Sequence, residues 1–321
     1  MKRIPIRIVV PCFILTLLVN CTQKDDFPIL KGPYLGQEPP GMTPEIFAPG
    51  IISTAFDEFK IVFSPDGKEL FYQLWGAPIP VILTMEEKDS RWTKPKVAPF
   101  SGQLIEGFDI TPDGDKIVIG SQQPLEGDDK PAERYNHWIA EKGDKGWEKP
   151  KYIQTSIQGY PTIAQSGNLY LGDKDLWMAN YVNGEYEKEV RLRGEINSKE
   201  FSETDPFIAP DESYILFCRR NDGFGSWDIF VSYQRKDGSW TKGINLGEPV
   251  NSKYSDVYPF VTTDGKYLFF SSSRTTHKDF YLSPITYEEK MNFLNNPGNG
   301  SQDIYWVSAQ IIEDLKPKYL E

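Results

Sequence analysis

Short apolar and aromatic runs alternate with polar turns along almost the whole chain after residue 43. Residues 205–246 show this pattern most clearly, with runs at 205–209, 214–217, 228–233 and 240–246. Pro210-Asp211, a Gly-rich loop and Lys236-Asp237-Gly238 separate these runs. Aromatic and β-branched runs favour strands, whereas Pro, Asp and Gly favour tight turns. The pattern therefore predicts a unit of four short strands.

The same unit recurs along the chain. Its first turn is marked, at spacings of 45 to 53 residues, by Asp66, Asp113, Ser166, Asp211 and Asp264. An Asp-aliphatic-aromatic phrase opens the predicted third strand at 175, 228 and 303, and a phrase like Trp-Thr-Lys at 92, 147, 186 and 240 is expected to mark the fourth strand. Three motifs in fixed order are typical of four-stranded propeller blades. The alternative is a β-sandwich with a few Asp-Gly turns.

The two ends of the repeat array predict how the ring closes. The last repeat has strands at 258–262, 267–271 and 303–309 but no fourth-strand phrase after them. Residues 44–52 resemble an outer strand and precede the first repeat, so we expect them to complete the last blade and remove an exposed sheet edge. This predicts an all-β domain at 43–321, a five-bladed β-propeller of four-stranded blades, with six blades as the alternative. The last blade also carries an insertion at 275–301 with a short helix predicted at 286–294, which is either functional or a passive ornament.

The run Phe-Ser-Pro-Asp-Gly-Lys-Glu-Leu-Phe-Tyr at 63–72 resembles the Pro-Asp variant of the WD repeat found in TolB-type propellers. The resemblance extends over nearly all of the chain after residue 43. It implies a propeller fold, but it implies no activity, because such blades occur in binding proteins and in enzymes.

The first residues resemble an export signal. Lys2, Arg3 and Arg7 precede an apolar stretch at 8–18, and residues 18–21 resemble a lipobox in which Cys21 is lipidated. We therefore expect a signal peptide at 1–20 and a linker tether at 21–42, with a plain secretory signal as the alternative. The Lys24-Asp25-Asp26 sequence resembles a surface-export signal, or is simply a solvated tether. This predicts an outer membrane lipoprotein that is surface-exposed or faces the periplasm.

Charge and cysteine content agree with an exported globular protein. The formal net charge is −11, and it becomes −14 when the three cations of the signal peptide leave. An acidic body does not favour nucleic acid as a partner, and the membrane is expected to be contacted through the lipid only. Of three cysteines, Cys12 lies in the signal and Cys21 at the lipid site, so Cys218 is expected to serve packing.

Candidate ligand-binding residues are those expected on one rim of the propeller channel. In a propeller, the residues before the inner strands and the loops joining second to third strands lie on the same rim. The tentative site comprises Glu58, Glu106, Asp109, Glu203, Asp205, Arg219, Arg220, Asp256 and Arg274. Trp75, Gln122, His137, Gln158, Asn221, Asp222 and His277 are expected nearby. Carboxylates facing arginines can bind a cation, a sugar or a peptide terminus, or they can simply accept backbone N–H bonds at strand starts.

Motifs for catalysis and metal binding do not occur in the sequence. It has no Gly-x-Ser-x-Gly elbow, no phosphate loop and no His-Glu-x-x-His motif, and it has only two histidines. Asn221-Asp222-Gly223 suggests calcium, but the twelve-residue loop with a closing Glu is missing. The expected protein is therefore a lipid-anchored propeller without a cofactor, calcium apart, that binds a cell-envelope protein, oligosaccharide or peptide. The alternative is a carbohydrate-active lyase or hydrolase with Glu203 and Asp205 as acid and base.

Overall fold

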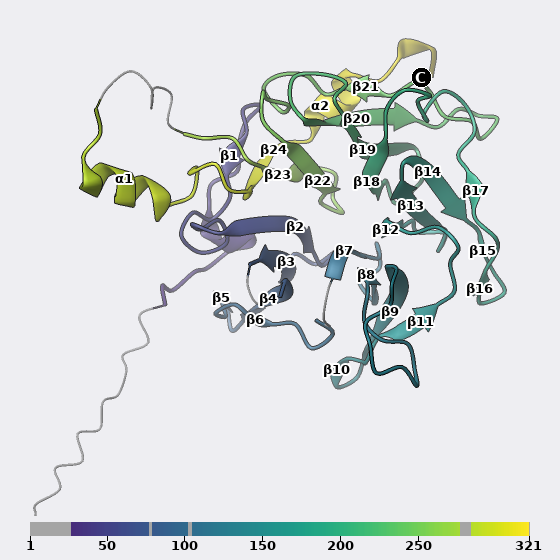
Figure 1. Ribbon diagram of the computed structural model, residues 1–321, viewed down its shortest axis with the longest axis horizontal. Helices are drawn as coiled ribbons and strands as arrows, with labels where there is room; N and C mark the ends of the chain where they lie inside the picture. The colour runs from purple at the N-terminus through teal and green to yellow at the C-terminus, as the bar shows by residue number, and fades with distance from the viewer. Residues whose placement is uncertain (1–26, 77–78, 102–104, 277–283, 321) are drawn as a thin grey trace, which may run out of the picture.

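A computed structural model describes residues 27–76, 79–101, 105–276 and 284–320. Its strands form five antiparallel sheets of four or five strands around a central axis, each of them one blade of a propeller, and a separate two-stranded hairpin (Figure 1). The predicted all-β, five-bladed fold is confirmed. None of the helices in the described part of the chain has the length and apolar character needed to span a membrane.

Each blade contains three long strands that follow one another from the channel outward. They are β2 (Asp57–Phe63), β3 (Glu69–Trp75) and β4 (Val81–Lys88) in blade 1; β7 (Ile105–Ile110), β8 (Lys116–Ser121) and β9 (Asn136–Gly143) in blade 2; β12 (Tyr160–Ile163), β13 (Leu169–Asp173) and β14 (Asp175–Ala179) in blade 3; β18 (Glu203–Ile208), β19 (Tyr214–Arg220) and β20 (Trp227–Tyr233) in blade 4; β22 (Asp256–Val261), β23 (Tyr267–Ser272) and β24 (Asp303–Ser308) in blade 5. A short outer strand completes each blade: β6 (Lys96–Val97), β11 (Lys151–Ile153), β17 (Val190–Arg191), β21 (Ile244–Asn245) and β1 (Glu45–Ile46).

The N-terminal outer strand closes the ring as predicted. β1 pairs antiparallel with β24 of the last blade, with Glu45 opposite Trp306 and Ile46 opposite Tyr305. Phe47 extends this pairing through a 2.8 Å hydrogen bond from its N–H to the carbonyl of Ile304. Its side chain is fully buried, so the closure also contributes to the apolar core.

The outer strands begin later than predicted. Trp92 and Trp147 lie in two-residue strands, β5 (Arg91–Trp92) and β10 (Gly146–Trp147), which form a hairpin with the end of the third strand. In blade 3 the corresponding hairpin is β15 (Tyr181–Val182) and β16 (Glu185–Tyr186), and the outer strand follows several residues later. The aromatic phrase therefore marks a hairpin that leads to the outer strand. The aromatic side chains of this hairpin pack between blades.

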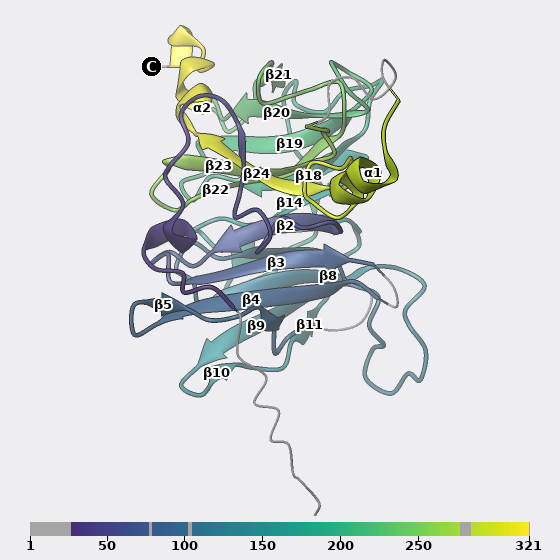
Figure 2. The ribbon, with the colours of Figure 1, turned by 90° about the vertical axis from the view of Figure 1, so that its left-hand side faces the viewer.

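Two helices lie at opposite ends of the propeller (Figure 2). The predicted insertion helix is α1 (Tyr287–Leu294), and Thr286 caps its N-terminus in a capping box with Glu289. It lies at the end where the inner strands begin, which we call the rim face. The other end, the turn face, carries the Asp-Gly turns and a helix that was not predicted, α2 (Gln310–Asp314), together with η2 (Lys318–Leu320).

The segment predicted as a tether lies against the propeller from residue 27 onward. Trp92 donates its backbone N–H to the carbonyl of Leu30 at 3.0 Å and its indole N–H to that of Gly32 at 2.9 Å. The segment continues through η1 (Pro33–Gly36), where Leu35 is buried. Residues 1–26, including Cys21, lie outside the described residues.

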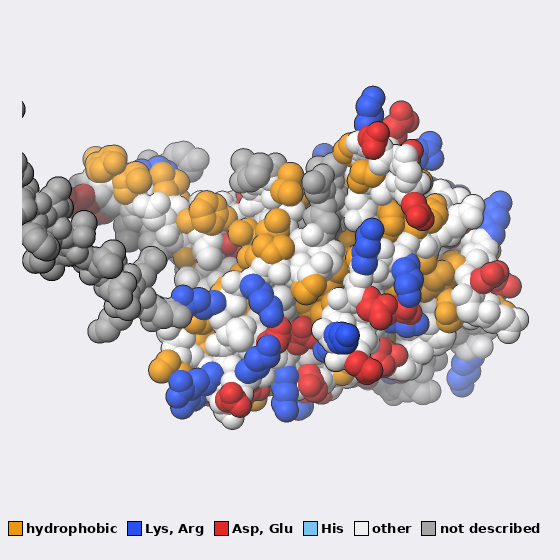
Figure 3. Space-filling model, turned by 90° about the horizontal axis from the view of Figure 1, so that it is seen from below, with side chains coloured by type: hydrophobic (Ala, Val, Ile, Leu, Met, Phe, Trp, Pro, Cys, Tyr) orange, Lys and Arg blue, Asp and Glu red, His pale blue; other side chains and the backbone are white. Residues whose placement is uncertain are grey.

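The net negative charge is not gathered on the outer edges of blades 1 and 2. Seen from below in the orientation of Figure 1, this side carries lysine, arginine, aspartate and glutamate side chains that are intermixed (Figure 3). Lys96 and Lys88 pair with Glu86, and Lys151 pairs with Glu141. Such mixing does not create a field of one sign on this side.

Candidate functional site

Three predicted rim acids occupy the starts of inner strands on the rim face. Glu58, Glu203 and Asp256 are all fully buried. Each carboxylate accepts a backbone N–H from the loop that leads into its own strand: from Thr54 to Glu58 at 3.0 Å, from Ser198 to Glu203 at 3.0 Å, and from Ser252 to Asp256 at 2.7 Å. These carboxylates therefore fix the loops that join consecutive blades. This is the alternative given in the sequence analysis, in which the acids accept backbone N–H bonds at strand starts.

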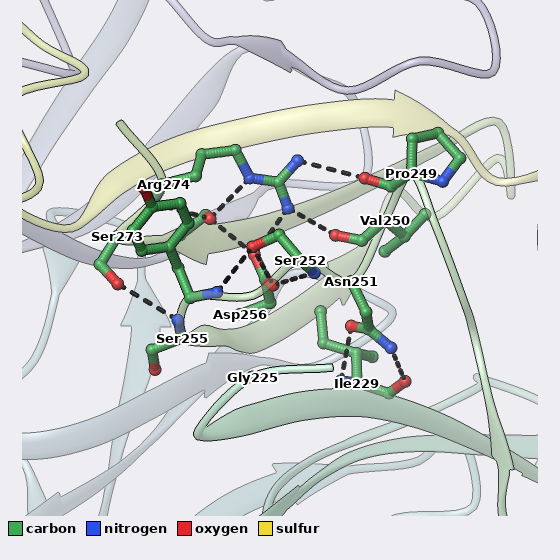
Figure 4. A network of polar contacts seen from close by, with 12 residues as sticks. Gly225, Ile229, Pro249, Val250, Asn251, Ser252, Ser255, Asp256, Ser273 and Arg274 are labelled. Atoms are coloured by element: carbon green, nitrogen blue, oxygen red, sulfur yellow. Dashed lines mark hydrogen bonds and ion pairs between the residues drawn. The ribbon is translucent and has the colours of Figure 1, made fainter. Parts of the chain in front are cut away.

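In blade 5 an arginine completes the polar network around Asp256 (Figure 4). The guanidinium of Arg274 contacts the Asp256 carboxylate at 2.6 Å and the hydroxyl of Ser272 at 2.8 Å. It also donates to the carbonyls of Pro249 at 3.1 Å and Val250 at 2.5 Å. The guanidinium therefore holds the preceding interblade loop against the acid.

Blade 4 contains a similar network that is more deeply buried. Arg219 is 3% exposed and donates from Nε to Glu203 at 2.8 Å. Its other nitrogens reach Asp222 at 3.1 Å and the carbonyl of Ile196 at 2.9 Å. Burial raises the pKa of Glu203, while the Ser198 N–H and the Arg219 charge oppose that rise.

Blade 1 has the acid without the arginine. No cation among the described residues pairs with Glu58, whose carboxylate contacts Thr54 through both the backbone N–H and the hydroxyl. Burial raises the pKa of Glu58 to about 8, with smaller contributions from Asp303 and Asp57. Burial also raises the pKa of Asp303 to about 7. Near neutral pH, Glu58 therefore favours its protonated form, whereas the corresponding acids of blades 4 and 5 are paired with a guanidinium.

The centre of the channel is filled by side chains from the middle of the inner strands. The Lys60 ammonium donates to the carbonyl of Pro259 at 2.9 Å, and the hydroxyl of Tyr258 donates to that of Tyr160 at 3.0 Å. With Asp205 and others they line a residual cavity of only about 10 Å³. The channel is therefore plugged.

Two predicted rim acids lie in the channel rather than at its mouth. β7 begins at Ile105, so Asp109 lies inside the strand, where it accepts a hydrogen bond from the Thr162 hydroxyl. Burial raises the pKa of Asp109, and the charge of Lys60 opposes this rise. Asp205 lies at a β-bulge of β18, with a positive φ of 49° and 6% exposure.

The remaining predicted residues do not join one common site. Arg220 is exposed, with its guanidinium 5.7 Å from the ring centre of Trp227. His137 is fully buried in β9, where its ring contacts the hydroxyl of Thr155 and the carbonyl of Gly159, and burial lowers its pKa. Cys218 is buried, and burial raises the pKa of its thiol. Glu106 belongs to β7, but its side chain lies outside the described residues, as does the whole of His277.

Sequence reasoning missed the asparagines that clamp the blades together. Asn251 accepts the N–H of Ile229 at 2.8 Å and donates to its carbonyl at 2.8 Å. Asn197 does the same to Leu176 in the preceding blade, at 2.6 Å and 3.2 Å. A signal was present, because both residues begin the same Asn-Ser-Lys phrase at 197–199 and 251–253. Each phrase joins the end of one blade to the start of the next.

The Asn221-Asp222-Gly223 sequence, which suggested calcium, uses its carboxylate to bind an arginine. The Asp222 carboxylate contacts Arg219, as described above. Within the described ranges, no group of three or more His, Cys, Asp or Glu residues is arranged to hold a metal ion.

Comparisons with known proteins find similar structures but no family. No family model matches the sequence, and no curated protein matches it. The structure is similar to a candidate TolB of Agrobacterium tumefaciens, at 16% identity and a TM-score of 0.47 over 79% of this chain and 90% of that one. TolB of Acinetobacter baumannii gives 12% identity and a TM-score of 0.47, over 79% and 57% of the chains. The α-L-arabinofuranosidase of Lactobacillus brevis gives 14% and 0.44, over 79% and 91%. Similarities this low assign no activity to this chain.

Proposed function

We propose that this propeller is an exported binding module that holds a partner protein on its rim face, with no catalysis of its own. The buried rim acids argue against catalysis at the rim, because each one holds an interblade loop and two of them are paired with arginines. The pairs Glu203–Arg219 and Asp256–Arg274 form within single blades, at 2.8 Å and 2.6 Å. A partner is therefore recognised by what the rim face exposes rather than by these charges.

The observation that carries this proposal is the uncovered helix of the insertion. None of the residues of α1 is buried, and Tyr287 and Leu294 are 79% and 41% exposed. Tyr287, Met291 and Leu294 follow one another at helical spacings of four and three, so they share one side of α1. A helix of two turns is marginally stable in water, and an apolar groove in a partner would cover this stripe.

The helix is attached to the rim rather than hanging free of it. The side-chain amide of Asn299 donates to the carbonyl of Leu294 at 3.0 Å and to that of Ala55 in blade 1 at 3.1 Å. Other large apolar side chains are exposed on the same face, on loops at Phe56, Ile79 and Phe224 and at the end of β3 at Trp75. The stripe of α1 and these side chains together offer an apolar surface of the kind found at protein interfaces.

The alternative, a carbohydrate-active enzyme using Glu203 and Asp205, has no supporting contact in the described residues. Glu203 is fully buried and bonded to Arg219, while Asp205 belongs to the plugged channel. A retaining or inverting glycosidase requires two carboxyl groups that face one substrate-sized space. Binding without catalysis is therefore the better-supported function.

The envelope location remains a proposal that rests on the sequence. We propose that the protein lies in the cell envelope with the lipid as its only membrane contact, because residues 1–20 resemble an export signal and residues 18–21 a lipobox that ends in Cys21. Cys21→Ser is expected to move the chain from the membrane fraction to the soluble fraction. Continued membrane association of that variant would contradict the lipid anchor.

Site-specific photo-crosslinking tests the partner proposal. A photoreactive amino acid replaces Tyr287 of the full-length lipoprotein in intact cells, and Tyr319, 72% exposed in η2 on the turn face, provides the matched control. We expect one discrete crosslinked protein from position 287 and none from 319. Met291→Ser with Leu294→Ser should reduce its yield roughly tenfold, the change that loss of about 1.4 kcal/mol of binding produces.

Two outcomes would contradict the rim-face proposal. One is equal crosslinking from positions 287 and 319, which would show that the rim face has no preferred partner. The other is conversion of an oligosaccharide that is abolished by Glu203→Gln, because a general acid or base loses most of its activity when it cannot transfer a proton.

A further inference from the structure

A second candidate site lies on the turn face, away from α1. A groove with a volume of about 580 Å³ runs between blades 2 and 3. Its lining includes Ile139 and Ile153 from blade 2, Ile163 from blade 3, and three tyrosines, Tyr152, Tyr181 and Tyr186. The lining also contains polar and charged side chains, and a mixed lining of this kind suits a small polar ligand.

The groove is open because blade 3 lacks a tryptophan that other blades have. In blade 2, Trp147 packs on blade 1, with its ring centre 5.3 Å from Phe100 and its indole N–H donating to Glu69 at 3.2 Å. In blade 4, Trp240 is 1% exposed and packs on Tyr170 of blade 3. The third hairpin carries Tyr186 at the corresponding place. A smaller ring there leaves space between the blades unfilled.

Two of the three tyrosines of the groove are exposed, and the pair on the hairpin is held in place. Tyr152 and Tyr181 are 42% and 38% exposed. The ring of Tyr181 lies 5.0 Å from that of Tyr186 across the β15–β16 hairpin, and the Asn168 side chain accepts the N–H of Tyr181 at 3.0 Å. The hairpin turn has positive φ at Asn183 and Gly184, which fits a tight two-residue turn. A preformed site of this kind costs little entropy on binding.

The charges in the groove are only partly paired, because the lining contains three carboxylates, Asp113, Glu141 and Glu185, and two ammonium groups, Lys116 and Lys151. The carboxylate of Glu141 contacts the ammonium of Lys151 at 2.7 Å and that of Lys116 at 3.7 Å. The neighbouring side of the molecule shows the same intermixing of charges (Figure 3). The lining therefore carries a net charge of −1, which disfavours an anionic ligand.

Two amide side chains provide neutral hydrogen-bonding groups at the same place. Gln154 and Gln165 line the groove and are exposed. None of the described residues hydrogen-bonds either side-chain amide. Each amide offers both donors and an acceptor, which is what a hydroxyl group requires.

We propose that the groove between blades 2 and 3 binds a neutral oligosaccharide. The tyrosine rings stack on the apolar C–H faces of the sugar rings, and the two glutamines exchange hydrogen bonds with the hydroxyls. The groove is on the opposite face from the proposed partner site, so the two proposals stand or fall independently.

Calorimetry on the purified full chain tests this proposal. The probes are the neutral hexasaccharides of cellulose, xylan, mannan and amylose, with a galacturonic acid oligomer and an oligopeptide for comparison. We expect at least one neutral oligosaccharide to bind, and Tyr152→Ala to weaken that binding roughly tenfold. Tyr186→Trp should abolish it by filling the groove as Trp147 does, while the melting temperature is maintained. Tyr319→Ala, an exposed tyrosine elsewhere on the turn face, should bind as the parent does.

Three outcomes would overturn the proposal. The first is that none of the four neutral oligosaccharides binds. The second is that the acidic oligomer or the peptide binds more tightly than every neutral sugar. The third is that a neutral oligosaccharide binds equally well to the parent, Tyr152→Ala and Tyr186→Trp, which would place its site outside the groove.

Discussion

Blades 4 and 5 place a guanidinium at the same point with arginines from different positions. In blade 4, Arg219 is the direct cross-strand neighbour of Glu203. In blade 5 the neighbour of Asp256 is Ser272, and the guanidinium comes from Arg274, two residues further on. The two blades therefore share the location of the guanidinium, although the arginine that provides it comes from a different position in the chain.

The surroundings of the two guanidinium groups agree closely. Arg219 lies 4.7 Å from the ring centre of Phe230 and 5.3 Å from that of Phe217. Arg274 lies 4.9 Å from Tyr305 and 5.3 Å from Phe270, rings on the corresponding strands. Each guanidinium also donates to the carbonyl just before a clamping asparagine. Arg219 donates to Ile196, which precedes Asn197, and Arg274 donates to Val250, which precedes Asn251. Blade 1 provides the contrast, because its buried Glu58 has no such partner and instead keeps a proton.

The largest expected effect is that of removing the buried arginine. Arg219→Met keeps the apolar stem but leaves the carboxylate of Glu203 buried without its cation. Breaking a buried pair from one side costs about 3–5 kcal/mol. Urea unfolding at pH 7 measures this, and the cost should fall as the pH is lowered, because loss of the Arg219 charge raises the pKa of Glu203 further.

The neighbouring arginine is a matched control for this change. Arg220 is exposed, so Arg220→Met should change the free energy of unfolding by no more than about 0.5 kcal/mol. Equal effects of the two substitutions would show that the Glu203–Arg219 pair contributes nothing beyond general surface charge.

A smaller effect is expected in blade 5, where the arginine can be moved. Arg274 is 17% exposed, so Arg274→Ser should cost less than the blade 4 change, about 2 kcal/mol. Adding Ser272→Arg places an arginine at the register position that Arg219 occupies in blade 4. Urea unfolding should show that this second change restores at least half of the loss.

The rescue has a position-specific control. Ser273→Arg in the Arg274→Ser background adds the same charge one residue later, where blade 4 has no counterpart in its network. Rescue by both arginines alike would mean that any nearby cation suffices, and the proposed equivalence of the two blades would then be wrong.

Much of the architecture could be predicted because its signals are local. The Asp-Gly turns and the missing fourth strand of the last repeat predicted five blades and the closure by residues 44–52, and both are confirmed. The contacts of the rim could not be predicted in the same way. The guanidinium of Arg274 reaches Asp256 only because the chain turns back beyond β23, and the sequence does not reveal that path.

Bulges and hairpins explain the other differences. The irregular pairing between Thr204 and Phe207 places Asp205 in the channel rather than at its mouth. The aromatic phrases mark interblade packing, so they preceded the outer strands rather than forming them. The groove lined by Tyr186 depends on a missing volume, which becomes visible only when the blades are placed side by side.

The last expected effect is a pH dependence rather than a loss of stability at one pH, and it concerns the buried acid of blade 1 that has no arginine partner. The pKa of Glu58 is about 8 in the folded protein, whereas the unfolded chain has the ordinary glutamate value of 4.5. Between these pH values the folded state binds a proton that the unfolded state releases, so stability falls as pH rises from about 4.5 to about 8. Glu58→Gln removes this contribution, which is at most about 1.4 kcal/mol per pH unit.

Thermal unfolding from pH 5 to pH 8 measures the slope, and an added arginine gives the sharper comparison. Asp303, with a pKa of about 7, leaves a residual slope in Glu58→Gln, which Asp303→Asn should remove.

Leu74 is the cross-strand neighbour of Glu58, as Arg219 is of Glu203, so Leu74→Arg should supply the missing guanidinium. A guanidinium there favours the ionised carboxylate, lowers the pKa of Glu58 and weakens the loss of stability toward pH 8. An unchanged slope in Leu74→Arg would show that blade 1 differs from blade 4 in more than the absence of one arginine.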